Sequence, residues 1–380
     1  MLLALKEVSF DTCLCHHLMS CHLRNLTTVI QILDREKEEL TMHRLSDTIT
    51  QARFQGALFV SRTNKTMIDA GYGWADQRTG RPNTPETPFQ IASISKQFTA
   101  GAILLLQEQE ALSVHDPLER WLPECSQEWK SITVHHLLTH TSGIGHWGDF
   151  PHLSLYHPIA HTDLFAVFQQ VPLKFAPGTA WAYSSPGYVL LAHIVEQIAG
   201  EPYAQFVERR ILAPLSMTRS SVGTHSSQPE QQAVGYAGKK KLPSFELDTV
   251  GIGAGDVWAT ARDLGLWNQA LMTPDRLLTA ESLTLMFTSH VSIPDVVSEI
   301  HDASYGYGWF RAEIGGHHVC FHPGDNSGFG GLNLLVPAAT LTIILLANDE
   351  DFDLWSLGQT LLGLALEETR KTEREAHGHA

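Results

Sequence analysis

The chain has 380 residues, of which 43% are hydrophobic, and it carries a formal net charge of -15 at neutral pH. This length and composition predict a globular protein with a large core, built as one large domain or two closely joined ones. The acidic charge and the lack of any basic stripe in the sequence exclude a nucleic-acid partner of the usual kind, because phosphate binding requires clustered Lys and Arg.

The first 41 residues share no pattern with the rest of the chain. We expect residues 1–41 to be a leader that is disordered or not native, with Met42 as the natural start; a genuine extension that is helical over residues 26–40 is the alternative. This leader lacks the sustained apolar stretch of a signal peptide. No run in the whole sequence approaches the ~20 apolar residues of a membrane span. A cytoplasmic location is therefore expected.

Cysteine and histidine crowd into the leader, where residues 13–22 contain three Cys and three His. These side chains are soft metal ligands, but the group lacks the paired second half of a zinc finger. His136 and His140 have the i, i+4 spacing of a zinc pair, yet no Glu at position 137 completes an H-E-x-x-H motif. We therefore predict no metal site and no cofactor.

From residue 42 onward the sequence shows regular elements. Residues 56–60 and 66–70 flank a polar turn and predict a hairpin, and residues 96–110 predict a helix that is apolar on all sides and hence buried. Helical patterns then dominate up to residue 255, at residues 135–138, 188–199 (ending at Gly200) and 203–212.

The last third of the chain returns to β-rich patterns. Thr260 begins a helix that reaches Leu271 through a motif like a capping box. Four short β runs and a final helix with one apolar face follow, at residues 307–312, 317–322, 332–336, 341–347 and 352–367. We therefore predict an α/β protein of the α+β type, in which the hairpin and the C-terminal strands form one antiparallel sheet of about five strands, flanked by helices.

The predicted domain covers residues 42–380. Its α/β part is formed by residues 42–100 and 256–380, and residues 101–255 form a mainly helical insertion.

Ser93 and Lys96 form the only S-x-x-K in the chain. On a helix, side chains three positions apart share a face, so the Lys96 amine can approach the Ser93 hydroxyl. A serine hydroxyl needs a neighbouring base to become a nucleophile, and burial would lower the pKa of Lys96 enough for it to serve. The start of the helix adds backbone donors for a developing oxyanion.

The stretch from Phe89 to Ala100 resembles the active-site helix of class C beta-lactamases, penicillin-binding DD-peptidases and their esterase relatives. The resemblance runs in order through nearly everything from Gly56 to Asn348, in blocks at residues 132–143, 177–179, 183–188, 213–217, 255–263, 305–309 and 322–324. It implies the serine beta-lactamase fold and a serine hydrolase that acts through an acyl-enzyme on Ser93.

The same resemblance assigns further residues. Tyr183 matches the tyrosine of the family's Y-x-N element, which would shuttle protons as a coupled pair with Lys96. His322 and Gly324 match the third element, K-T-G or H-x-G, and the oxyanion hole would use the backbone N–H groups of Ser93 and Asp325. The sequence leaves open whether Lys96 or Tyr183 removes the serine proton.

Two positions depart from the family pattern. Ser185 stands where Asn is usual, which weakens hydrogen bonding to a substrate amide, and His322 replaces the lysine of true beta-lactamases with a group only partly charged near neutrality. We therefore expect a small-ester hydrolase. A D-amino-acid-type peptidase, a DD-carboxypeptidase, a beta-lactamase, or a catalytically weak penicillin-binding or scaffold protein are the alternatives. The expected partner is a small ester, amide or peptide substrate.

Overall fold

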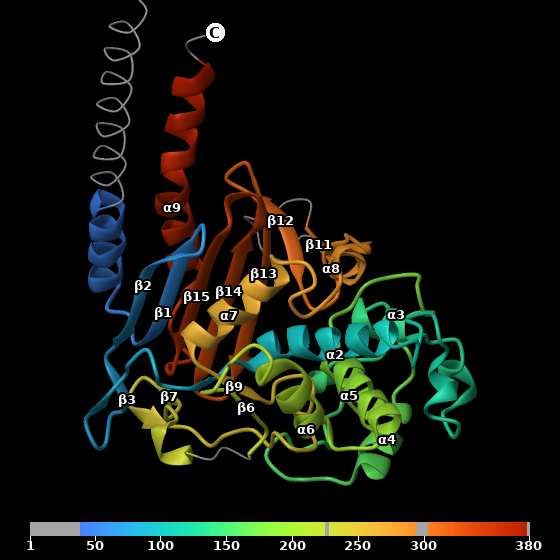
Figure 1. The fold of residues 1–380 in the computed structure, drawn as a ribbon. Coiled ribbons are helices and arrows are strands. Elements are labelled where there is room, and N and C mark those ends of the chain that lie inside the picture. Colours follow the sequence, from blue (N-terminus) through green and yellow to red (C-terminus); the bar gives the residue numbers. More distant parts are fainter. Residues whose placement is uncertain (1–38, 225–227, 294–302, 378–380) are drawn as a thin grey trace, which may run out of the picture. The chain divides into compact units, whose positions relative to one another are not determined.

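The computed structural model describes residues 39–224, 228–293 and 303–377 (Figure 1). The predicted leader up to residue 38, with its Cys and His group, lies outside the described residues. The boundary that we predicted after residue 41 falls inside a helix, because residues 39–52 form one continuous helix. By their internal contacts the residues divide into two compact units.

The smaller unit contains the residues up to Gln51 and those from Gly363 onward. In its described part, helix 39–52 buries Leu45 and Ile49, which lie one turn apart on one face. Arg44 of the same helix pairs with Glu367 of α9 (Leu354–His377) at 2.6 Å.

The larger unit, Ala52–Leu362, contains an antiparallel sheet of eight strands among the described residues. The predicted hairpin joins the C-terminal strands, because Gly56 of the first strand pairs with Ala347 of the last. The order is β10-β11-β12-β13-β14-β15-β1-β2, with bounds Val291–Ser292, Ser304–Tyr305, Phe310–Ile314, His317–Asn326, Phe329–Val336, Leu341–Ala347, Gly56–Arg62 and Lys65–Tyr72.

The predicted number of about five strands was therefore wrong. The two-residue strands β10 and β11 extend the sheet beyond β12, and they are too short for an alternating pattern to show in the sequence. Every residue of β14 and β15 is buried, because helices cover both faces. Gly265 of α7 (Ala261–Leu271) lies against the Phe59 ring on one face, and Gly358 of α9 lies against Leu332 on the other.

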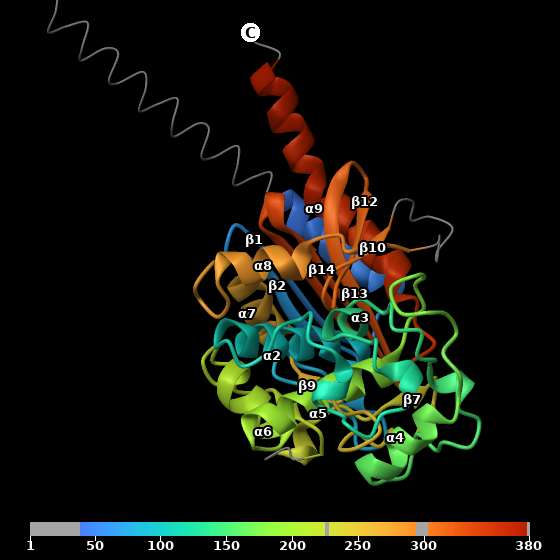
Figure 2. The same cartoon turned by 90° about the vertical axis from the view of Figure 1, so that its right-hand side faces the viewer.

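The other helices are α2 (Lys96–Glu108), α3 (Val134–Leu138), α4 (His161–Gln169), α5 (Ser185–Ala199), α6 (Tyr203–Val207), α7 (Ala261–Leu271) and α8 (Ala280–Phe287). The remaining strands are β3 (Trp74–Asp76), β4 (Arg81–Pro82), β5 (Phe89–Gln90), β6 (Ser221–Val222), β7 (Tyr236–Ala237), β8 (Lys240–Lys241) and β9 (Val257–Ala259). Helices α3 to α6 gather beside α2, away from the large sheet (Figures 1 and 2).

Local signals in the sequence set several of these boundaries. Helix α5 ends at Gly200, whose φ of 66° lies in the left-handed region that glycine adopts without strain. Thr260 caps α7 by accepting a hydrogen bond from the backbone of Asp263. The helix expected over residues 203–212 is instead α6 followed by a π-helical turn, Glu208–Leu212. None of the helices in the described ranges combines the length and apolar character needed to cross a membrane.

Helix α2 is buried from Lys96 to Leu106 and lies at the centre of the larger unit. A buried polar network fixes its first turn. The side-chain oxygen of Gln97, Oε1, accepts hydrogen bonds from Trp267 of α7 and from Asn333 of β14, each at 3.1 Å. These two hydrogen bonds hold the start of α2 against α7 and β14, which sets the place of its N-terminal end.

Candidate active site

Ser93 lies in a single 3-10 turn, Ala92–Ser95, that connects β5 to α2. The turn begins with Ala92 at φ 50°, an unusual conformation for a residue with a side chain. The hydroxyl of Ser95 holds the turn against β9 by accepting from the Val257 N–H at 3.0 Å. Ser93 is partly exposed while its neighbours in the turn are buried, so the backbone presents this one hydroxyl.

The Lys96 amine lies 3.1 Å from Oγ of Ser93, as the S-x-x-K spacing predicts, and it also donates to the Ala254 carbonyl at 2.7 Å. Lys96 is fully buried. Burial lowers its pKa to about 7, an effect that the charge of Asp256 opposes. At neutral pH Lys96 is therefore present in both charged and neutral forms, and the neutral form is a base within hydrogen-bond reach of the serine.

Asp256 is the acidic group whose charge raises the pKa of Lys96. It is buried, and its carboxylate accepts a hydrogen bond from the Gly253 N–H at 2.9 Å. Burial raises the pKa of Asp256 to about 7, so the two groups titrate over the same range and influence each other.

Tyr183 packs against Lys96, with the amine 5.0 Å from the centre of its ring. Burial raises the pKa of the Tyr183 hydroxyl above its usual range, and the nearby Ser93 hydroxyl opposes this rise. The Tyr183 hydroxyl is buried and has no hydrogen bond of normal geometry to a described residue. Tyr183 is thus a phenol at neutral pH, with its proton available for transfer.

Two histidines hold the backbone that follows Tyr183. The N–H of Ser184 donates to Nδ1 of His140, and the N–H of Ser185 donates to Nδ1 of His146, each at 3.2 Å. Burial is the main cause that lowers the pKa of both imidazoles, to about 4 for His146. Both rings are therefore neutral acceptors that position this segment at the start of α5.

His322 is neutral as well, in contrast to the partly charged group that its sequence position predicts. Its Nδ1 lies 2.6 Å from the Pro323 carbonyl, and its Nε2 lies 3.0 Å from the Tyr305 hydroxyl. A carbonyl can only accept, so Nδ1 carries the proton and Nε2 accepts from Tyr305. Burial lowers the pKa of His322 to about 3, and the nearby Lys96 charge adds to this effect.

Gly324 brings strand β13 against the serine turn. A Cβ at this position would lie 2.3 Å from the Ile91 carbonyl oxygen, so only glycine permits this approach. Strand β12 begins at Phe310, opposite Phe321, so among the described residues the β13 edge at 322–326 has no strand partner on that side. The backbone of Asp325 is thereby placed near the Ser93 turn.

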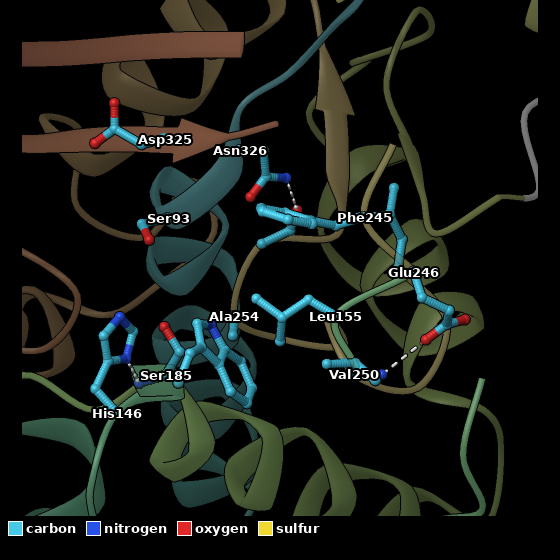
Figure 3. A pocket seen from close by; sticks show the side chains of 14 residues that line it. Ser93, His146, Leu155, Ser185, Phe245, Glu246, Val250, Ala254, Asp325 and Asn326 are labelled. Carbon is cyan, nitrogen blue, oxygen red and sulfur yellow. Dashed lines mark hydrogen bonds between the residues drawn. The ribbon is translucent and has the colours of Figure 1, made fainter. Parts of the chain in front are cut away.

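Ser93 opens into a cavity of about 220 Å³. Figure 3 shows Ser93 and Asp325 on one side of it and Leu155 and Val250 across from them. The polar lining consists of Ser93, His146, Ser185, Glu246, Asp325 and Asn326, and the largest apolar contributions come from Trp147, Leu155, Phe245, Leu247 and Val250. Among the described residues no Lys or Arg lines the cavity, and burial raises the pKa of Asp325.

The structure thus brings together the site residues predicted from the sequence, which are Ser93, Lys96, Tyr183, Ser185, His322, Gly324 and Asp325. The sequence reasoning missed Asp256, Tyr305 and the structural roles of His140 and His146. The only sequence signal for Asp256, Tyr305 and His140 is their position inside blocks that resemble the family, and His146 lies outside those blocks.

Comparison with known proteins gives one family and several relatives. Residues 35–362 match the family model described as Beta-lactamase. PbpX of Bacillus subtilis strain 168, a protein named for penicillin binding, is 30% identical over 314 residues, which cover 80% of this chain and 73% of PbpX. Esterase EstB of Burkholderia gladioli is 34% identical over 205 residues, 50% of this chain and 52% of EstB.

A solved structure shows the same architecture. The penicillin-binding protein of Bacillus halodurans superposes with a TM-score of 0.74 and 27% identity, covering 84% of this chain and 98% of that one.

Proposed function

From the premise that the chain belongs to the beta-lactamase family and is a serine hydrolase, we propose that Ser93 is its nucleophile and that small esters are its substrates. The observation that carries the proposal is the contact of 3.1 Å between Lys96 and Ser93, made by an amine whose pKa is about 7. A lysine with an ordinary pKa would hold its proton at neutral pH and could not accept another.

In the acylation step, neutral Lys96 accepts the Ser93 proton while Oγ attacks the ester carbonyl carbon. The backbone N–H groups of Ser93 and Asp325 donate to the oxyanion that forms. As the intermediate collapses, the C–O bond to the alcohol breaks. The departing alkoxide takes a proton from Tyr183, which recovers one from the Lys96 ammonium.

In the deacylation step a water molecule replaces the alcohol. Lys96 accepts a proton from the water, as it did from Ser93, while the water oxygen attacks the acyl carbon. Ser93 then regains a proton as the acid leaves. Since Tyr183 begins as a phenol and Lys96 is partly neutral, we assign the first proton transfer to Lys96 and the relay to Tyr183.

The charges around the cavity support a substrate without a carboxylate. Penicillins and peptide C-termini carry one, but His322 is neutral and the part of the chain that the structure describes places no Lys or Arg in the cavity lining. The Asp325 side chain adds a carboxyl group on the Ser93 side. An anion bound there would lie next to an acidic group in a partly dehydrated site, which is unfavourable. The small apolar lining instead suits a short acyl chain.

One observation favours a second candidate, a peptidase or amidase for substrates with a free amino group. The Asp325 carboxyl group lines the cavity, where it could pair with a substrate ammonium (Figure 3). This candidate differs from a DD-carboxypeptidase, whose substrate would bring a carboxylate to the same place.

The test compares kcat/KM for p-nitrophenyl acetate and butyrate, a chromogenic cephalosporin, a D-Ala-D-Ala peptide and D-alanine p-nitroanilide, each divided by its uncatalysed rate. We expect the largest enhancement for the esters. A larger value for the cephalosporin or the D-Ala-D-Ala peptide would replace the esterase proposal with a beta-lactamase or carboxypeptidase.

The Asp325→Asn variant separates the two remaining candidates, because Asn keeps the backbone N–H and removes the charge. Ester hydrolysis should change little. A selective loss of D-alanine p-nitroanilide hydrolysis, combined with a larger rate enhancement for that substrate in the unchanged protein, would establish the amidase instead.

A further inference from the structure

Helices α4 and α5 lie side by side (Figures 1 and 2), and their facing surfaces carry a group of metal-ligating side chains. His161 is the first residue of α4, and His193 and Glu196 lie one turn apart on α5. One possible ligand atom from each of the three lies within 4.8 Å of the others. The proposed catalytic machinery uses none of these residues.

The two contacts of Glu196 with the histidines are longer than direct hydrogen bonds of normal geometry. Oε2 of Glu196 lies 3.8 Å from Nδ1 of His161 and 3.8 Å from Nδ1 of His193, beyond normal hydrogen-bond length. Zinc holds nitrogen and oxygen ligands at about 2.0–2.2 Å, which separates two ligands of a tetrahedral site by roughly 3.3–3.6 Å. The two distances to Glu196 exceed this separation by a few tenths of an ångström, and the ligand atoms of the two histidines lie within 4.8 Å of each other. Side-chain movements on the order of 1 Å would therefore close the site.

Two ring nitrogens in the group have no hydrogen-bond partner among the described residues. Nδ1 of His193 and Nε2 of His161 are buried and make no hydrogen bond to a described residue. A buried polar atom without a partner is costly, and a metal ion would satisfy the imidazole of His193.

The surroundings resemble the outer shell of a metal site. The second carboxylate oxygen of Glu196 accepts the Tyr203 N–H at 2.9 Å, which orients the first toward the histidines. Phe165 stacks on His161 and meets His193 edge-on, so an apolar ring fixes both imidazoles.

We propose that His161, His193 and Glu196 bind one Zn²⁺ ion, with water as the fourth ligand. The ion would tie the beginning of α4 to α5. The chain just before α4 forms part of the cavity wall, where Leu155 accepts from the Glu246 N–H at 2.8 Å and the Ile159 N–H donates to Thr249 at 3.2 Å. The metal therefore stabilises the helical region and the wall of the cavity, and takes no part in the chemistry.

The experiment uses the full chain, freed of metal with a chelator and then titrated with Zn²⁺ against a fluorescent indicator. We expect one equivalent to bind and the melting temperature to rise, since an ion that binds the folded state stabilises it. His193→Ala and Glu196→Gln should weaken this site by more than the roughly 10–100-fold that outer-shell substitutions cause. The control is His157→Ala, which removes an exposed histidine from the same region.

The Cys and His group at residues 13–22 is a second possible source of zinc binding. Co²⁺ distinguishes the two, because thiolate ligands add a charge-transfer absorption band that imidazole and carboxylate ligands do not. Metal binding that is equal in the unchanged protein, His193→Ala and Glu196→Gln would overturn the proposal, as would the absence of binding. Neither result bears on the hydrolase activity.

Discussion

The pH dependence of ester hydrolysis tests the role of Lys96 quantitatively. An unperturbed lysine with a pKa of ~10.4 is neutral in about one molecule in 2,500 at pH 7, whereas half of Lys96 is neutral there if its pKa is about 7. If neutral Lys96 is the base, kcat/KM should reach about one tenth of its plateau at pH 6 and about one half at pH 7. The assay follows p-nitrophenyl butyrate at the isosbestic wavelength of the product.

Asp256→Asn identifies the group that titrates. The Asp256 charge raises the pKa of Lys96, so its removal should move the acidic limb of the profile to lower pH. Asn can still accept the Gly253 hydrogen bond, which keeps the local structure. The exposed Asp275 supplies the matched control, Asp275→Asn, whose profile should equal that of the unchanged protein.

Two results would refute this reasoning. A profile that is flat from about pH 5.5 to pH 8.5 would mean that no base with a pKa near 7 takes part. If the acidic limb disappears in Asp256→Asn, the titrating group is the Asp256 carboxyl and the assignment to Lys96 is wrong.

Three further predictions follow from the same structure. Lys96→Ala and Tyr183→Phe should each lower kcat/KM by orders of magnitude, and the double variant should be no worse than the poorer single one, because members of one catalytic unit are not additive; additive losses would argue against a coupled pair. Thermal stability should fall between about pH 6.5 and pH 4, because the unfolded chain binds protons at histidines near ~6.5 while folded His146 and His322 bind them only near 4 and 3; a melting temperature that stays constant over this range would contradict it. A chain that starts at Met42 should match the full chain in melting temperature and esterase activity, and an insoluble or inactive product would show that residues 1–41 are required.

Local sequence signals predicted much of the fold because they act over a few residues. The hairpin at Gly56–Tyr72, the cap at Thr260 and the left-handed end of α5 at Gly200 each depend on neighbours in the chain. Strands β10 and β11 have only two residues each, so they show no periodicity in the sequence, although β11 pairs with the nearby β12. That part of the sheet was not predictable from pattern.

The same distinction applies to the site. Ser93 and Lys96 are three residues apart, so helical geometry alone predicts their contact. The neutrality of His322 depends on burial and on Tyr305, which lies seventeen positions earlier in the chain, so no local motif could reveal it. The proposed zinc ligands could not be predicted for a similar reason. His193 and Glu196 are one helical turn apart, but His161 joins them only through the packing of α4 on α5.

Intact-mass spectrometry tests the central claim most directly, because it detects the acyl-enzyme itself. After exposure to a fluorophosphonate, the unchanged protein should gain the mass of one covalent adduct, and peptide mapping should place the adduct on Ser93. Ser93→Ala, with an unaltered melting temperature as its control, should gain none. An adduct that persists in Ser93→Ala, or one that maps to another residue, would contradict Ser93 as the nucleophile.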